Sequence, residues 1–262
     1  MGLFVRATMA VVVVVSLCMV CGCQLAGKSD SIRSTNVVLV LPGIDGAGPW
    51  YNSLIGGLKE GGDDVELVSW GTPLMFFANL MFPAIHGPAE RNLAERIRRE
   101  RAEHPDGRII LVGHSAGCGV ILQALARLET GLQVETVVLL APAVSEKYDL
   151  APAISHTRGT VHVFYSSHDQ MLPSTCVTGT YDHVFSNSGG LNGFALTERL
   201  PAMAREHLDQ HPYDPAWKKL GCEGGHFGWR SKPFVEQVLV PLVEERPARA
   251  AITKSPELGA GT

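Results

Sequence analysis

A serine between glycines is the first chemically suggestive feature of the chain. Residues 113–117 read Gly-His-Ser-Ala-Gly; they follow the apolar run 109–112 and precede the apolar residues Val120 and Ile121. A strand, a sharp turn and a helix in this order present a serine hydroxyl at the end of a sheet, where a helix N-terminus favours developing negative charge. This setting predicts that Ser115 is a nucleophile.

A nucleophilic serine needs a base and an acid placed elsewhere in the chain. The base is a histidine that removes the hydroxyl proton, and a carboxylate fixes the tautomer of that histidine. Asp169 directly follows the strand pattern of residues 160–165, and His226 lies in a glycine-flanked loop before the last helical pattern. The order Ser, Asp, His is one of the known triad orders. We therefore expect Asp169 and His226 to act with Ser115.

Other carboxylates compete for the role of the acid. Asp149 follows the strand pattern of residues 135–140 and is the main alternative to Asp169, whereas Asp182 and Asp209 are weaker candidates.

Other histidines are expected to be outside the site. His168 adjoins Asp169 but is expected at the surface, and His114 is expected to point away from the pocket. His207 and His211 have the i, i+4 spacing of a helical metal pair, but the glutamate of the H-E-x-x-H motif is missing. We interpret this pair as a solvated helix end, and we expect neither a metal site nor a cofactor.

At these residues the chain resembles the α/β-hydrolase superfamily, in particular its serine esterases and lipases. The acid loop of that family has an S-x-x-D-x-x-V-P-like pattern, which Ser166, Asp169 and Pro173 match with Leu172 replacing the usual valine. The resemblance spans about residues 36–245. It implies Ser115 as nucleophile, His226 as general acid and base, and Asp169 as the group that orients His226.

The resemblance also implies an oxyanion hole. Residues 41–48, Leu-Pro-Gly-Ile-Asp-Gly-Ala-Gly, follow the first strand pattern, where the family places this loop. The implied donors are the backbone N–H groups of Ile44 and Ala116. Pro42 stands where a histidine is frequent, and by itself the segment also fits an ordinary glycine-rich turn.

The elements that must position these groups alternate along the chain. Strand patterns cover residues 36–41, 65–70, 108–112, 135–140 and 160–165, and most are continuous apolar runs, as in strands buried on both faces. Helical patterns include a charged helix around Leu93 and Ile97, the segment after Ser115 and a final helix at about 232–245. This alternation predicts an α/β fold with a doubly wound, mostly parallel sheet of the α/β-hydrolase type.

The N-terminal segment differs from the rest. Residues 1–23 contain one basic residue, Arg6, and an apolar run at 9–21, which is typical of a secretory signal. Their end resembles the lipobox of bacterial lipoproteins, which implies lipidation of Cys23, a tether at 24–35 and membrane anchoring on the periplasmic or cell-surface side. Ordinary signal cleavage, giving a secreted or periplasmic protein, is the alternative. The domain then spans 36–245, and residues 246–262 read as a disordered tail.

Three cysteines remain in the expected domain. Cys176 and Cys222 lie within a few residues of the proposed acid and base, and export permits disulfides, so we expect this pair to form one. Cys118, behind the serine turn, is expected to be a small buried side chain.

The composition excludes some functions and leaves others open. A net charge of −4 provides no basic surplus for nucleic acid. We expect a serine hydrolase that cleaves small-molecule or lipid carboxylic esters through an acyl-enzyme; the alternatives are an acyltransferase or thioesterase on the same triad, or a non-catalytic surface-anchored binding protein. Two further segments have two interpretations each. Residues 73–83 either line an acyl pocket or form a lid, or they are a buried approach to the charged helix. Residues 178–194 are either a loop over the site or an insertion far from it.

Overall fold

The computed structural model describes residues 35–71, 79, 83–195, 200 and 202–245. The chain divides into two compact units, Met1–Arg33 and Ser34–Thr262, and every described residue belongs to the second. The predicted signal segment, Cys23, the tether up to residue 34, the tail at 246–262 and most of residues 73–83 therefore lie outside the described residues. Within the described part, no helix has the length and apolar character needed to cross a membrane.

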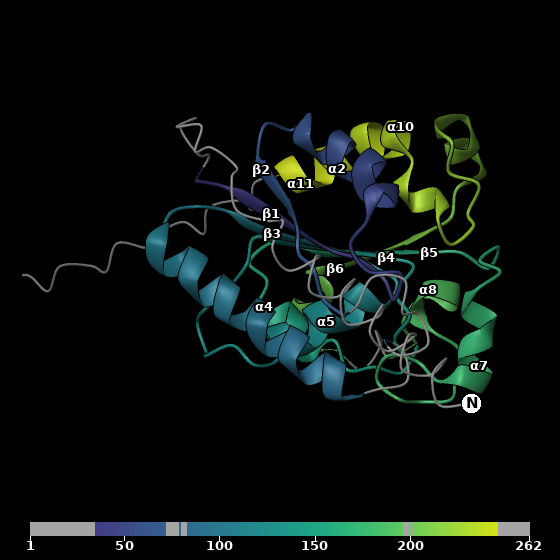
Figure 1. Ribbon diagram of the computed structural model, residues 1–262, viewed down its shortest axis with the longest axis horizontal. Coiled ribbons are helices and arrows are strands. Elements are labelled where there is room, and N and C mark those ends of the chain that lie inside the picture. Colours follow the sequence, from purple (N-terminus) through teal and green to yellow (C-terminus); the bar gives the residue numbers. More distant parts are fainter. Residues whose placement is uncertain (1–34, 72–78, 80–82, 196–199, 201, 246–262) are drawn as a thin grey trace, which may run out of the picture. The chain divides into compact units, whose positions relative to one another are not determined.

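The centre of this unit is one six-stranded sheet in the order β2-β1-β3-β4-β5-β6 (Figure 1). Every neighbouring pair of strands is parallel. The strands are β1 (Val37–Leu41), β2 (Asp64–Leu67), β3 (Ile109–His114), β4 (Thr136–Leu140), β5 (Val161–Tyr165) and β6 (Leu208–Pro212). The predicted doubly wound, mostly parallel α/β fold is confirmed.

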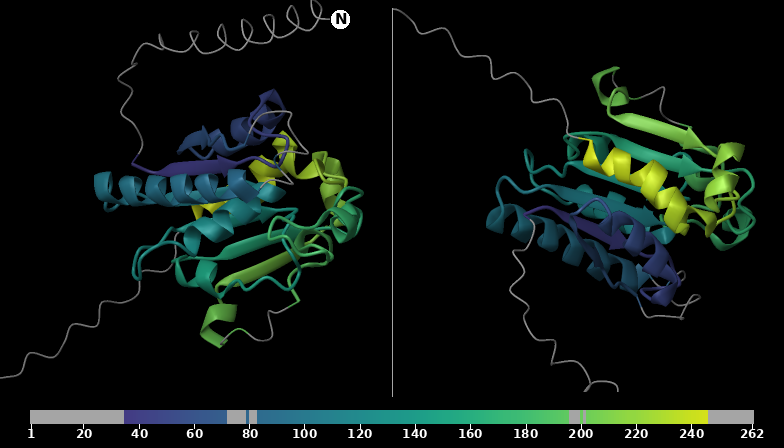
Figure 2. Two further views of the ribbon diagram at one scale, coloured as in Figure 1. Left: turned by 60° about the horizontal axis from the view of Figure 1, so that its bottom comes forward. Right: turned by 90° about the horizontal axis from the view of Figure 1, so that it is seen from above.

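Helices cover both faces of the sheet. In Figures 1 and 2, α4 and α5 lie on one face, whereas α2, α10 and α11 lie on the other. The longer helical segments are α2 (Asn52–Lys59), α4 (Pro83–Glu103) and α5 (Ala116–Leu125), and the C-terminal segment consists of α10 (Lys232–Phe234), the π-helical turn η6 (Val235–Leu239) and α11 (Val240–Glu244). The predicted final helix is thus present, with a π-helical turn in its middle.

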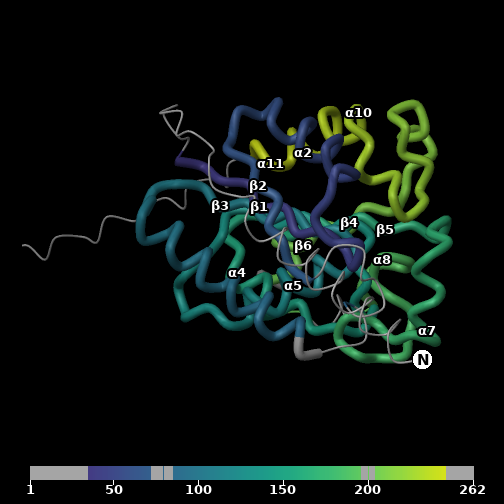
Figure 3. The backbone as a smooth tube through the Cα atoms, in the orientation of Figure 1, coloured from purple at the N-terminus to yellow at the C-terminus, as the bar shows by residue number. Residues whose placement is uncertain are grey.

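Short helical segments lie in the connections between these elements. They are η1 (Pro49–Tyr51), α6 (Ala151–Ser155), η2 (Leu172–Ser174), α7 (Thr175–Thr178), α8 (Gly189–Asn192), α9 (Ala202–Arg205), η4 (Pro215–Leu220) and η5 (Gly228–Arg230). The backbone trace shows that the yellow α10 and α11 return to the side of the sheet occupied by α2 (Figure 3).

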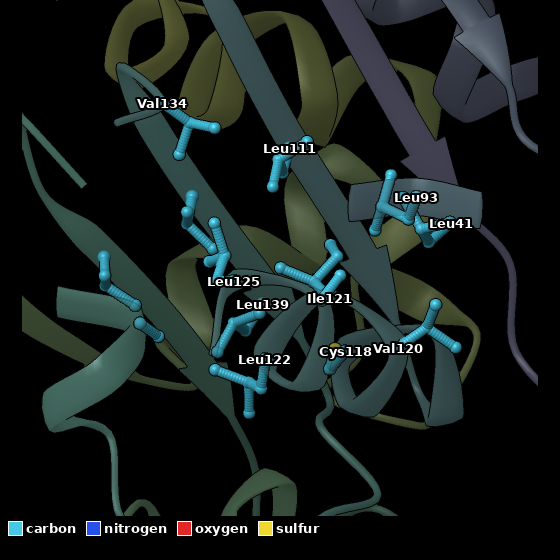
Figure 4. Close-up of a cluster of buried hydrophobic side chains, with 14 of the residues drawn as sticks. Leu41, Leu93, Leu111, Cys118, Val120, Ile121, Leu122, Leu125, Val134 and Leu139 are labelled. Atoms are coloured by element: carbon cyan, nitrogen blue, oxygen red, sulfur yellow. The ribbon is translucent and has the colours of Figure 1, made fainter. Parts of the chain in front are cut away.

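Each face of the sheet has its own apolar core. The core between the sheet and α5 includes Leu41, Leu111, Ile121 and Leu139, which are all less than 1% exposed (Figure 4). The opposite core contains Phe164, Trp229 and Phe234 among others. Because both faces of β1, β3, β4 and most of β5 are buried, these strands read as continuous apolar runs in the sequence.

Strand β6 differs from the sequence-based expectation. Its residues, Leu-Asp-Gln-His-Pro, are half-buried or exposed and lack an apolar run, because β6 is the edge strand and pairs with β5 alone. The interpretation of His207 and His211 as a helix end is wrong, since His211 lies in this strand and His207 directly before it.

Candidate active site

Ser115 lies where β3 ends and α5 begins. Its backbone has φ of 55° and ψ of −122°, a conformation in which a non-glycine residue is strained. The two flanking glycines permit this turn: a Cβ on Gly113 would lie 2.9 Å from the backbone of Cys118, and one on Gly117 would collide with the carbonyl oxygens of Leu41 and Pro42. The turn is therefore the strand-turn-helix setting that the sequence predicted.

The side chains of Ser115, His226 and Asp169 form one continuous hydrogen-bonded chain. Ser115 Oγ lies 3.0 Å from His226 Nε2, and His226 Nδ1 lies 2.7 Å from Asp169 Oδ2. All three residues are buried. The structure thus brings the predicted nucleophile, base and acid together, although they are separated by up to 111 positions in the chain.

The loop after β5 holds the carboxylate of Asp169 in place. Its Oδ1 accepts hydrogen bonds from the backbone N–H groups of Met171 at 2.9 Å and Leu172 at 3.0 Å. The other oxygen, Oδ2, is left to accept from His226. A carboxylate fixed in this way selects the tautomer with the proton on Nδ1, so Nε2 is free to accept the proton of Ser115.

The competing acids lie elsewhere. Asp149 is exposed and its Oδ1 accepts from the N–H of Ala151 near the start of α6, and Asp182 accepts from the N–H of Ser145. Asp209 lies on β6 beside His211. The exposed His168 packs its ring against Tyr213, at 5.2 Å between centroids.

The loop after β1 lies beside Ser115, and side chains fix its shape. Ile44 and Ala116 both line the pocket that contains Ser115 and His226. The N–H of Gly43 donates to the Tyr51 hydroxyl at 2.7 Å, and Trp70 Nε1 donates to the carbonyl oxygen of Pro42 at 2.7 Å. The predicted donors Ile44 and Ala116 therefore both lie at the pocket of Ser115, one on a loop and one at a helix start.

The pocket beside Ser115 is mainly apolar. Its walls combine the loop after β1, the segment after β4, and residues 171–181 around η2 and α7. The lining includes Ile44, Ala143, Met171, Leu172, Tyr181 and Phe227. Thr178, Gly179 and Tyr181 are part of this wall, so the first part of the 178–194 segment lies at the site.

His114 belongs to the site, contrary to the sequence-based expectation. It lines the pocket, and Nε2 lies 2.9 Å from the backbone oxygen of His226, while Nδ1 lies 2.9 Å from the hydroxyl oxygen of Tyr51. Burial, together with the nearby charges of His226 and Arg230, lowers the pKa of His114 well below its usual value. His114 is therefore neutral at pH 7.

Tyr51 and Arg230 complete this supporting network. Burial and the neighbouring carboxylate of Asp45 raise the pKa of Tyr51, so its hydroxyl stays protonated. Arg230 forms an ion pair with Asp45 at 3.1 Å and stacks over the rings of Tyr51 and Phe227 at 4.7 and 4.5 Å. No motif in the sequence singled out Tyr51 or Arg230; their positions depend on contacts between distant segments.

The predicted disulfide between Cys176 and Cys222 is wrong, because both thiols are free in the structure. Cys222 is fully buried in the core that contains Trp229, whereas Cys176 is exposed on α7 with its Sγ 3.1 Å from Asn187 Oδ1. Burial raises the pKa of the Cys222 thiol to about 11. Cys118 is buried, as expected.

Comparison with known proteins agrees with the fold. The model of a family described as "Serine hydrolase" matches residues 78–189, which include Ser115 and Asp169 but not His226. No curated protein sequence matches significantly.

Similar solved structures include an α/β serine hydrolase without lid from Xanthomonas campestris, with 15% identity over 84% of this chain and 87% of that chain and a TM-score of 0.48. A cold-adapted esterase from an Arctic intertidal metagenomic library has 14% identity over 83% and 84% of the two chains, with a TM-score of 0.49. A CIB-like hydrolase from Thermoplasma acidophilum has 13% identity over 83% and 88%, with a TM-score of 0.46. The parallel sheet with helices on both faces is an α/β fold, and the family match supports a hydrolase.

Proposed function

We propose that the chain is a carboxylic ester hydrolase that works through an acyl-enzyme on Ser115. The observation that carries this proposal is the continuous chain from Ser115 Oγ through His226, 3.0 Å away, to Asp169, a further 2.7 Å from the imidazole. A strained serine, a base within hydrogen-bond reach and a buried carboxylate behind the base form the arrangement that activates a hydroxyl.

The first half of the reaction forms the acyl-enzyme. Ser115 Oγ attacks the ester carbonyl carbon while His226 Nε2 takes the hydroxyl proton. The carbonyl oxygen becomes an oxyanion, which the N–H groups of Ile44 and Ala116 stabilise. When the intermediate collapses, His226 gives its proton to the departing alkoxide, which leaves as an alcohol.

The second half uses water in the same way. A water molecule attacks the acyl carbon and passes a proton to His226, the bond to Ser115 Oγ breaks, and His226 returns that proton to the serine. The product is a carboxylic acid, and the enzyme is restored. Asp169 stays ionised throughout and stabilises the imidazolium form of His226.

The lining of the pocket favours esters with an apolar acyl group. Ile44, Leu172 and Phe227 offer apolar contacts next to Ser115, and burial of such surface stabilises a bound acyl chain by about 25 cal/mol per Å². The substrate class is therefore small-molecule or lipid esters with an aliphatic or aromatic acyl part.

A fluorophosphonate probe, which labels activated serines covalently, tests the proposal. The wild-type chain is expected to label at Ser115, as read by mass spectrometry of the labelled peptide, and Ser115→Ala is expected not to label. Ser174→Ala is the matched control, because Ser174 lines the same pocket and its hydroxyl donates to the carbonyl oxygen of Met171. Failure of the folded wild-type chain to label supports a non-catalytic binding protein instead.

Two matched substitutions test the assignment of the acid. Asp169→Asn is expected to lower kcat by about 10⁴-fold, because the amide no longer selects the required tautomer of His226. Asp149→Asn is expected to leave kcat unchanged, since the exposed Asp149 carboxylate bonds only to the start of α6 among the contacts described. The reverse pattern would make Asp149 the acid.

The fate of the acyl group separates hydrolysis from transfer. A p-nitrophenyl ester assayed with and without added alcohol or amine acceptors is expected to release free acid in both cases. Formation of the transfer product as the main species would identify an acyltransferase, and faster cleavage of the matched thioester would identify a thioesterase. All three activities use the same three residues, because the acceptor and the leaving group are chosen by the pocket walls.

We also propose, from the sequence alone, that residues 1–23 direct export and that Cys23 carries a lipid anchor on the periplasmic or cell-surface side. The mass of the mature N-terminal peptide is the test. A diacylated or triacylated Cys23 that is lost in Cys23→Ser supports the anchor, whereas an unmodified N-terminus after cleavage supports ordinary secretion.

A further inference from the structure

A histidine-rich cluster lies on the two strands at one edge of the sheet, away from Ser115. His162 is the second residue of β5 and stands opposite Asp209 of β6, and His211 is two residues further along β6. Alternate residues of a strand share a face, so all three side chains project from the same side of the sheet. β5 and β6 are neighbours in the sheet and lie side by side in Figure 2.

The donor atoms of these three residues converge. His162 Nδ1 lies 3.1 Å from His211 Nε2, and His211 Nε2 lies 3.3 Å from Asp209 Oδ2. One nitrogen or oxygen from each of the three residues lies within 4.8 Å of the other two. In a tetrahedral zinc site with bonds of about 2.0–2.1 Å, neighbouring donors are about 3.3 Å apart. The observed spacings are close to this value.

The surroundings of the cluster suit a metal site with one open side. His162 is 3% exposed, the His211 side chain is 22% exposed and the Asp209 side chain is 58% exposed, so the cluster runs from the core to the surface. The ring of His211 stacks on the buried Phe164 with centroids 4.5 Å apart, which fixes its orientation. Three protein donors and a solvent-facing fourth position form a common zinc arrangement.

The chemistry of the donors indicates which metal the cluster would take. Two imidazoles and one carboxylate form a nitrogen and oxygen donor set. Such a set suits Zn²⁺ among the divalent cations and does not suit Ca²⁺ or Mg²⁺, which take oxygen ligands.

We propose that His162, Asp209 and His211 form a zinc-binding site that fastens the edge strand β6 to β5. The sequence predicts no metal site here, because it places His207 and His211 on a helix and leaves His162 unconnected. The pairing of β5 with β6 joins His162 to His211 across 49 positions and excludes His207, whose Nδ1 bonds to the carbonyl oxygen of Gly159 at 2.6 Å.

The cluster lies at the opposite end of β5 from the triad, so an ion bound there would not take part in ester hydrolysis. His162 lies near the amino end of β5, whereas Asp169 follows the carboxyl end of the same strand. An ion at the cluster would bridge the two strands by ligand bonds in addition to their backbone hydrogen bonds. Because β6 pairs with β5 alone, it is the strand that gains most from a second attachment.

Zinc titration of the tag-free full-length chain tests the proposal. After treatment with a chelator, the wild-type chain is expected to bind one Zn²⁺ per molecule by equilibrium dialysis and to unfold at a higher temperature when Zn²⁺ is present. His211→Gln and Asp209→Asn are expected to weaken binding at least tenfold and to remove the thermal shift. All of these chains also carry Cys176→Ser, and the chain with this substitution alone is the background. The exposed thiol of Cys176 then cannot bind Zn²⁺ in any of them.

His104→Gln is the matched control, because His104 directly follows α4 and lies outside the cluster. It is expected to bind Zn²⁺ as the background chain does. The proposal is overturned if the background chain, shown to be folded by circular dichroism, binds no Zn²⁺, since the close pair would then be a His–His hydrogen bond. It is also overturned if the cluster variants bind as tightly as the control.

Discussion

The imidazole of His114 holds the backbone of His226 in place, with Nε2 2.9 Å from the carbonyl oxygen of the residue whose side chain contacts Ser115. His114 is neutral and donates its Nε2 proton to that carbonyl, so its Nδ1 is an acceptor and faces the Tyr51 hydroxyl at 2.9 Å. The same hydroxyl accepts from the N–H of Gly43, next to Ile44. Tyr51 and His114 therefore connect the proposed oxyanion loop to the loop that carries the proposed base.

Tyr51→Phe tests this connection. The substitution leaves the N–H of Gly43 without its acceptor in a buried place and is expected to lower the free energy of unfolding by about 1–3 kcal/mol. Because the loop that carries Ile44 loses its fixed position, kcat is expected to fall about tenfold or more while KM changes little. Ester hydrolysis and urea unfolding measure the two effects.

Tyr148→Phe is the control for the loss of a tyrosine hydroxyl. Tyr148 packs against the core beside α5, outside the network of Tyr51 and His114. It is expected to retain wild-type kcat. Equal kcat in Tyr51→Phe and wild type would show that the hydroxyl has only a structural role.

The depressed pKa of His114 makes the fold sensitive to acid. The unfolded chain binds a proton at this histidine near its ordinary pKa of 6.5, whereas the folded chain does so only at a lower pH. Unfolding therefore takes up a proton between these two pH values, and stability that is fully present above about pH 6.5 is lost as the pH falls through this range. The groups that face His114 are Tyr51, His226, Arg230 and, through Tyr51, Asp45.

His114→Gln isolates this contribution, because its amide N–H₂ can still donate a hydrogen bond but does not titrate. Other buried histidines add slopes of the same sign, so the difference between the two chains is the relevant quantity. Urea unfolding from pH 8 to pH 5 is expected to show a smaller decline in the variant below pH 6.5. Parallel declines in the two chains would mean that His114 does not stay neutral when folded.

The parts of this site that the sequence predicts are those fixed by local patterns. Ser115 directly follows the apolar strand β3, and Asp169 comes shortly after the apolar strand β5. His226 lies in a glycine-flanked loop, so each of the three residues can be recognised from its neighbours in the sequence. The carboxyl ends of parallel strands meet at one edge of the sheet, and this topology brings the three together.

The parts that the sequence does not predict depend on packing between distant segments. Tyr51 is fully buried against His114, 63 positions away, and no motif marks either residue for that contact. Strand β6 has no apolar run, because an edge strand buries little of its surface, so His211 is mistaken for part of a helix. The disulfide prediction is wrong for the same reason. It is based on the closeness of Cys176 and Cys222 to catalytic residues in the sequence, which does not reveal that Cys222 is packed in the core.

The exposed side chain of Met171 is expected to influence which acyl chains the enzyme prefers. Met171 lines the pocket, and 46% of its surface is exposed, so it lies at the border between the pocket and solvent. Met171→Ser is expected to lower kcat/KM for long-chain p-nitrophenyl esters about three- to tenfold relative to the acetate, because apolar contact is lost.

Val177→Ser is the control for a polar substitution in the same region. Val177 is 80% exposed on α7 and is not part of the pocket lining. For Val177→Ser, the ratio of kcat/KM for the long-chain p-nitrophenyl ester to kcat/KM for the acetate is expected to equal the wild-type ratio. If the two variants change this ratio equally, the acyl chain does not pass Met171.

Gly117 is required by the close approach of α5 to the loop after β1, independently of any catalytic role. A Cβ at this position would overlap the backbone oxygens of Leu41 and Pro42, which cannot move aside as the end of a flexible side chain can. Gly117→Ala is therefore expected to lower the free energy of unfolding by about 3 kcal/mol or more.

The matched control is Gly56→Ala in the middle of α2, where the nearest atom to the new Cβ is the flexible Lys232 Cε at 3.7 Å. Alanine there is expected to stabilise the chain by about 0.5–1 kcal/mol. Urea unfolding of both variants measures the difference, and equal stability of Gly117→Ala and wild type would show that α5 does not approach the β1 loop as closely as described.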